Sequence, residues 1–398
     1  MSTTQLNWKK KVIWSAIEDT YNTDPGLSAA VSGIEARNVS ITPLKTKRVE
    51  QNIDVPYLGS LREMVVGEEM LLKFDIAIAG SGAAGTAPAW GKLLRACKRS
   101  ETVLAAAIAG AAQAGNAASL TLAAGASAVD DVYRNMEIVA TGGAGDGQSA
   151  IIKSYNGTTK VATFYEAVTT PFDGTTAYSI PAQTVYAPID DNDDSMTHYA
   201  YIDRAKFVMT GARGNVSYTI DPLKPAVFSF SFTALYGGYS DVVAMPGDTV
   251  YTAWKDPLAV SNTNTTGFKL HGFAANVYSY TVDDGHTVTH RDDMIGVDDV
   301  VIAARKSTGS VTIQMPLKAE HDFFAAARGV GNNGRPIEGA MTINHGTVAG
   351  NIVRFFQPAV TVGDPMPEEK SGGVAAIKMA LGVFPVAPGG NDSLIIVK

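Results

Sequence analysis

A single cysteine and a low content of charge are the first features of this 398-residue chain. Cys97 cannot form an intrachain disulfide, and a lone cysteine in a helical setting is typical of a buried structural thiol. Charged residues make up 18% of the sequence, against about a quarter in an average domain. Gly, Ala, Ser and Thr are abundant, which favours a β-rich fold with many turns over helical bundles.

Long basic clusters and long apolar runs are missing as well. The net charge is −7, and the densest basic stretches are Lys9 to Lys11 and Lys45 to Arg48. A tight nucleic-acid binder needs more cations to neutralise phosphates, so this class is disfavoured and any DNA contact should be loose. The most apolar stretch, Val103 to Val129, is interrupted by polar residues, and the N-terminus lacks a signal-peptide core. We therefore expect no membrane span and assembly in the cytoplasm.

Strand-like patterns dominate the chain. Large apolar residues alternate with polar or small ones in Met70 to Ile78, Val227 to Thr233 and Val311 to Met315. Helical candidates are few and short, and the best are Ala89 to Arg99 and Lys318 to Arg328. The sequence thus predicts a mainly β fold.

An internal repeat organises these segments. Asn38-Val39 matches Asn276-Val277 at an offset of 238, and each pair precedes a charged, irregular stretch and then an alternating strand. Each strand leads to a short predicted helix with an aromatic residue near its start, where Trp90 matches Phe323 at an offset of 233. The pattern predicts two copies of one domain.

The later strands repeat at a smaller offset. Phe207 matches Phe355 at an offset of 148, and Val227 matches Val374 at an offset of 147. The offset therefore falls from 233 to 147, so the first copy carries 86 additional residues between its helix and its late strands. This places an insert at about residues 103–184.

The insert resembles a small β unit by its own pattern. Strand-like Met136 to Val139 and Ala150 to Lys153 flank a glycine-rich turn, and Asn156-Gly157 predicts a hairpin. The predicted division of the chain is a first domain in two parts, 1–102 and 185–250, the insert at 103–184, a linker at 251–266, and a second domain at 267–398.

Gly80 to Gly85 reads G-x-G-x-x-G directly after a strand, as a dinucleotide-binding loop would. Pro88 stands where the phosphate-binding helix should already be running. Further β-hairpins follow, where that fold would continue with alternating strands and helices. We interpret the segment as a loop between strand and helix.

Metal-ligand spacings are weak. His286 and His290 lie four apart in a Thr/Val-rich stretch, and on a strand this spacing is roughly 13 Å, too long to share a metal. Asp190 to Asp194 lacks the glycine and distal glutamate of a calcium loop, so a solvated loop is expected. With no nucleophile elbow, P-loop or neighbouring Cys–His pair in the sequence, we assign no catalytic residue, cofactor or metal.

Two charged stretches, Leu44 to Val66 and Asp283 to Val300, follow the repeated strand starts. Such an arm loses conformational entropy unless it docks, and a partner subunit is the favoured surface. The alternative is an intramolecular hairpin that covers its own domain. The residues predicted to contact other subunits or rings are Lys47, Arg48, Ile53, Tyr57, Leu58, Leu61, His290, Arg291, Met294 and Ile295.

Six segments of the two copies share features with one known family: Ala87 to Cys97, Val185 to Pro188, Phe207 to Val216, Phe228 to Gly237, Ser307 to Ile313 and Gly346 to Val353. They resemble the major tail tube proteins of long-tailed bacteriophages. The insert is similar to a small β module that is common in phage structural proteins, through Tyr155 to Thr163.

The resemblance implies two tail-tube-type β-sandwich domains, each with a short helix, plus the inserted β module. In this family, inner strands of neighbouring subunits join into a ring, arms reach the next ring, and stacked rings form the conduit for DNA ejection. Two copies per chain imply homotrimeric rings with pseudo-sixfold symmetry in the virion tail. The implied partners are further copies of the chain, the tail terminator, tape-measure and distal tail proteins, and DNA in transient passage.

Two other functional classes stay open. One is a nucleotide-cofactor (FAD or NAD) oxidoreductase that uses Gly80 to Gly85. The other is an adhesive β-sandwich protein of a cell surface, which the missing signal peptide disfavours. The leading interpretation is a structural virion protein without enzymatic activity.

Overall fold

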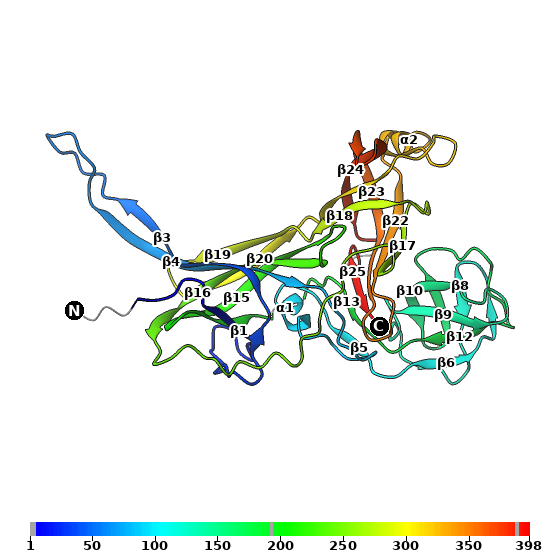
Figure 1. Ribbon diagram of the computed structural model, residues 1–398, viewed down its shortest axis with the longest axis horizontal. Coiled ribbons are helices and arrows are strands. Elements are labelled where there is room, and N and C mark those ends of the chain that lie inside the picture. Colours follow the sequence, from blue (N-terminus) through cyan, green and yellow to red (C-terminus); the bar gives the residue numbers. More distant parts are fainter. Residues whose placement is uncertain (1–4, 192–193, 387–389) are drawn as a thin grey trace.

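The computed structural model describes residues 5–191, 194–386 and 390–398 (Figure 1). In these residues, twenty-five strands and two short helices are found, so the predicted mainly β fold is confirmed. None of these helices has the length and apolar character needed to cross a membrane. Asn192 and Asp193, in the middle of the predicted acidic loop, lie outside the described residues.

The first repeat is formed from both sides of the insert. Its elements are β1 (Lys11–Ile17), β2 (Gly33–Ile34), β3 (Arg37–Glu50), β4 (Glu63–Ala77), α1 (Gly91–Arg95), β5 (Thr102–Leu104), β13 (Gln183–Tyr186), β14 (Met196–Ile202), β15 (Ala205–Ile220) and β16 (Val227–Asp241).

The second repeat follows a connecting segment. Its elements are β17 (Thr265–Leu270), β18 (Val277–Asp283), β19 (His286–Asp292), β20 (Asp298–Arg305), β21 (Thr308–Gln314), α2 (Phe323–Arg328), β22 (Glu338–His345), β23 (Val353–Lys370), β24 (Val374–Phe384) and β25 (Leu394–Val397).

The two repeats share one strand order. Hydrogen-bonded neighbours run β3-β4-β16-β15 in the first repeat and β18-β21-β24-β23 in the second. Residues that correspond in the sequence repeat also occupy corresponding positions in the two sheets. Phe230 of β16 pairs with Phe74 of β4, and Ile377 of β24 pairs with Ile313 of β21. The offset of 147 between Phe230 and Ile377 is therefore also a structural equivalence.

Alternating side chains build the core of each repeat. On β16, Phe228, Phe230 and Phe232 are buried, while Ser229 and Ser231 lie on the opposite face. The three phenylalanines join one apolar core that runs through both repeats. Trp90, beside α1, packs on Phe228 at a ring distance of 5.0 Å, so the helix covers the core face of the sheet.

Both helices are shorter than predicted. α1 ends at Arg95, because Lys98 takes a left-handed conformation with φ of 51°. α2 begins only at Phe323, because the Asp322 side chain accepts a hydrogen bond from the Ala325 N–H at 2.8 Å and caps the helix there. Gly329, at φ of 64°, ends α2.

Seven strands within residues 103–184 form a separate sheet, at the right of Figure 1. They are β6 (Ile108–Ala111), β7 (Ala114–Gly115), β8 (Ser119–Thr121), β9 (Glu137–Gly142), β10 (Ser149–Asn156), β11 (Val161–Phe164) and β12 (Ala177–Ile180). Although it is inserted into the first repeat, this sheet shares its core with the second repeat, through Phe356, Leu394 and Ile396.

Candidate assembly interface

A continuous sheet joins the two repeats. Ser217–Ile220 of β15 pair antiparallel with Tyr280–Asp283 of β18, so eight strands run in order from β3 to β23. The Asp284 N–H donates to the Val216 carbonyl at 3.1 Å, which extends the pairing by one residue. The last strand of the four-strand run in the first repeat, β15, thus pairs with the first strand of the run in the second repeat, β18.

A buried ion pair fixes this join. The Arg99 guanidinium donates to both oxygens of Asp284 at 2.8 and 2.6 Å, and both side chains are fully buried. Arg99 also donates to the Ser393 carbonyl at 2.8 Å. Burial alone would lower the pKa of Arg99, but the charge of Asp284 offsets this and the pKa is raised. No sequence pattern indicated either residue.

Buried polar groups continue from that ion pair. Tyr218 shares a 2.8 Å hydrogen bond with Ser393 and accepts one of 2.7 Å from the Gln357 amide. Tyr280 donates to Gln357 at 3.0 Å. Burial raises the pKa of Tyr218 to about 12, so this phenol is neutral. The network connects β15, β18 and β23.

Each end of the eight-strand run has a free edge. Within the described residues, β3 pairs only with β4, and the part of β23 beyond Thr361 pairs only with β24. These edges are the counterparts of the joined ones, because β3 corresponds to β18 and β23 to β15. A chain with two such complementary edges can bind a second copy of itself head to tail.

The free edges carry prolines and opposite charges. Pro43 on β3, and Pro365 and Pro367 on β23, lack a backbone N–H and reduce unspecific pairing. Lys45 lies exposed on the first edge, and Glu369 is exposed on the second. Lys45 is already paired with Glu69 of β4 in its own chain, so these charges alone do not select a partner edge.

The first predicted arm is the long β3–β4 hairpin, which projects from the body at the upper left of Figure 1. Ile53, Tyr57 and Leu58 are exposed, and Leu58 has a relative exposure of 104%. Leu61 is half-buried. Arg48 binds Glu63 at 3.2 Å within the hairpin. The apolar tip is therefore open to solvent in the part of the chain that the structure describes.

The second predicted arm is the β19–β20 hairpin, which lies against the first repeat of its own chain. His290 is buried, with Nε2 at 2.7 Å from Asp298 and Nδ1 at 3.8 Å from Glu69 of β4. Arg291 pairs within the hairpin with Asp299, at 2.6 Å. Lys47, from the first arm, holds Asp292 at 3.0 Å.

The tip of this second hairpin is exposed. Met294 and Ile295 are exposed, at 95% and 84%. The body of the second arm therefore forms a hairpin that covers its own chain, which was the alternative to a partner contact. A contact with a partner subunit stays a prediction for the tip of this arm and for the first arm.

The glycine-rich loop is packed against the second repeat. The Gly80 N–H donates to the Asn351 side chain at 2.7 Å, and the Gly82 N–H donates to the Gly350 carbonyl at 2.9 Å. A Cβ on Gly80 would lie 2.2 Å from the Gly350 carbonyl oxygen, so glycine is needed for this approach. These two backbone donors are therefore already used and do not point to a bound phosphate.

One serine–histidine contact is buried within the first repeat. Ser15 Oγ lies 2.6 Å from His198 Nδ1, and both side chains have no solvent exposure. Burial lowers the pKa of His198 to about 3, with a smaller effect from Lys92. A substrate has no path to this serine, so the pair is structural.

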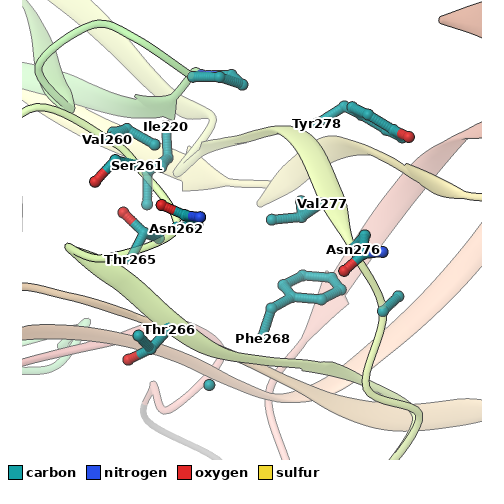
Figure 2. A pocket seen from close by; sticks show the side chains of 13 residues that line it. Ile220, Val260, Ser261, Asn262, Thr265, Thr266, Phe268, Asn276, Val277 and Tyr278 are labelled. Atoms are coloured by element: carbon teal, nitrogen blue, oxygen red, sulfur yellow. The ribbon is translucent and has the colours of Figure 1, made fainter. Parts of the chain in front are cut away.

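A pocket beside the join, shown in Figure 2, has no charged side chain in its lining. Ile220, Val260, Phe268, Val277 and neighbouring Ser, Thr and Asn side chains line it. Its lining holds no carboxylate, histidine, cysteine, lysine or arginine. Among the residues that the structure describes, no cluster of His, Cys, Asp and Glu has metal-binding geometry. His286 and His290 lie on one face of β19, as expected for a strand.

A scan against models of known protein families and a search of curated proteins found no match to this chain.

Proposed function

We propose that this chain is the subunit of a tail tube, a structural protein whose closed rings stack into a conduit for DNA. The observation that carries the proposal is the β15–β18 join. It binds the edge of one repeat to the equivalent edge of the next and leaves the same two edges free at the ends. Repeating this contact between chains closes a ring and removes every exposed inner edge.

The resemblance to tail tube proteins implies three chains per ring. Each chain supplies eight inner strands, so three chains supply twenty-four. With a spacing of about 4.8 Å and a tilt of about 40°, such a barrel has a backbone diameter of about 48 Å. A second layer about 10 Å thick on the inside would take up nearly half of that width. The layer with α1 and the insert holds many more elements than the single β19–β20 hairpin on the opposite face, so we place this larger layer outside.

The surface of the inner strands supports a passive role. Opposite the core, β16 presents Ser229 and Ser231, and their cross-strand neighbours include Ser217 and Asn215. On the β4 side, their cross-strand neighbours are Asp75 and Lys73, one charge of each sign. The net charge of −7 favours loose contact with DNA. The resemblance to tail tube proteins adds the implied partners, which are the tail terminator, tape-measure and distal tail proteins, and the location in the virion.

Electron microscopy of the concentrated, purified protein tests the proposal. We expect rings or tubes with threefold symmetry and a pseudo-sixfold inner barrel. A protein that stays monomeric at every concentration and salt condition contradicts it, and so does the presence of bound flavin or nicotinamide in near-stoichiometric amounts, measured by absorbance.

A further inference from the structure

The β19–β20 hairpin crosses the first repeat on the face opposite its core. It contacts β15 and β16, and the Arg213 guanidinium donates to the Val300 carbonyl at 2.7 Å. On β4 it reaches Glu69, and at the root of the first arm it reaches Lys47. The arm of the second repeat thus lies across β15, β16, β4 and β3 in turn.

The face beneath this hairpin is closed to solvent. Neighbouring positions on β4, β16 and β15 are Glu69, Leu235, Thr210 and Arg213, with relative exposures of 8%, 4%, 7% and 8%. Leu71 and Arg213 flank Thr233 in the adjacent row of the sheet. In both sets of cross-strand neighbours, the side chains point away from the core.

The equivalent face of the second repeat is open. Ala380 of β24 takes the place of Thr233, and its cross-strand neighbours are Ser310 and Gly363. In the next row, Gly382 takes the place of Leu235, between Thr308 and Thr361. Every one of these six residues is exposed or half-buried, and all are small.

We propose that this small-residue face, formed by Thr308, Ser310, Thr361, Gly363, Ala380 and Gly382, is the docking surface for the first arm of a neighbouring copy. The inference rests on the proposed ring and adds the site of its arm. The occupant is residues 47–66 of the second copy, which correspond to the docked hairpin 286–305 at the repeat offset of 239, one more than the offset at the strand starts.

The arm and the face fit in shape and chemistry. The arm exposes Val49, Ile53 and Val65, and burial of such side chains drives association. A face of Gly, Ala, Ser and Thr lets a crossing hairpin approach closely. The position is also continuous with the predicted edge contact, because an arm that leaves β3 beside β23 would next cross β23, β24 and β21, as β19–β20 crosses the first repeat.

Substitutions of Ala380 test the inference in the full chain. We expect Ala380→Arg to fold with unchanged circular dichroism and to lose ring formation in analytical ultracentrifugation, while Ala380→Ser assembles as the parent does. Ala109→Arg, an exposed alanine on the edge strand β6 of the insert, is the matched control and should also assemble. Rings of the Ala380→Arg variant with normal affinity would overturn the docking site.

A labelling experiment covers the case in which Ala380→Arg does not fold. The thiol of an Ala380→Cys variant should react with maleimide in the monomer and lose at least tenfold in rate in rings, while an Ala109→Cys variant keeps its rate. Cys97 is fully buried and contributes no background. Equal labelling of Ala380→Cys in rings and monomers overturns the docking site, whereas a parent chain that forms no rings contradicts the proposed function itself.

Discussion

Two arginine–aspartate pairs in this chain share a bidentate geometry and differ in burial. Arg99–Asp284 at the join has no solvent exposure, whereas Arg291 of the pair with Asp299 is 48% exposed. Removal of one partner leaves an unpaired buried charge in the first pair. In the second pair, water solvates the charge that remains. The first pair should therefore contribute far more to holding the repeats in one orientation.

We predict that Asp284→Asn lowers the free energy of unfolding by about 3–5 kcal/mol. The matched variant Asp299→Asn should lower it by about 1 kcal/mol or less. Urea unfolding followed by tryptophan fluorescence measures both losses. Equal losses in the two variants would show that the buried pair does not stabilise the join.

The strands were predictable where one face is buried. Met70 to Ile78, Val227 to Thr233 and Val311 to Met315 lie within or largely overlap β4, β16 and β21, because burial of alternate side chains imposes a period of two. The join could not be predicted, since the pairing of β15 with β18 is a tertiary contact between strands of ordinary pattern. Arg99 likewise resembles any charged residue that follows a helix.

The sequence predicted both arms as segments but did not predict where each arm docks. Both were predicted as charged stretches with apolar residues, yet one docks on its own chain and the other projects. Local pattern cannot separate these outcomes, because they depend on tertiary contacts: the second arm contacts β15 and β16 of the first repeat, and the first arm projects from the body.

At the scale of these elements, the arm tip should control assembly without affecting folding. We predict that Leu58→Asp leaves the midpoint of thermal unfolding unchanged and weakens ring formation at least tenfold, because the variant would bury a charge in the contact. Leu223→Asp, at a leucine that is 90% exposed in the β15–β16 turn, is the control and should assemble normally. Sedimentation velocity over a concentration series measures both, and unimpaired assembly of Leu58→Asp contradicts the assignment of the arm.

For the whole molecule, the duplication means that a ring of six equivalent repeats needs only three chains. In the proposed ring, one of every two junctions lies within a chain. There the two repeats are covalently connected, and the Arg99–Asp284 ion pair stabilises their contact. The other junction must form between chains, and its prolines leave fewer backbone donors than the internal join has. The edge contact and the arm therefore have to act together.

A pair of introduced cysteines tests closure directly. Thr281 Oγ1 lies 3.4 Å from Thr219 Oγ1 at the internal join, and the equivalent positions on the free edges are Thr42 and Lys370. Oxidation of a Thr42→Cys, Lys370→Cys double variant should give a non-reducing gel ladder of one, two and three chains that stops at three. Neither single variant should form that ladder, and Cys97 is buried with a raised pKa because of desolvation, so it should stay unreactive. A ladder that continues beyond three chains would indicate an open filament, and the absence of any cross-link would place the contact between chains elsewhere.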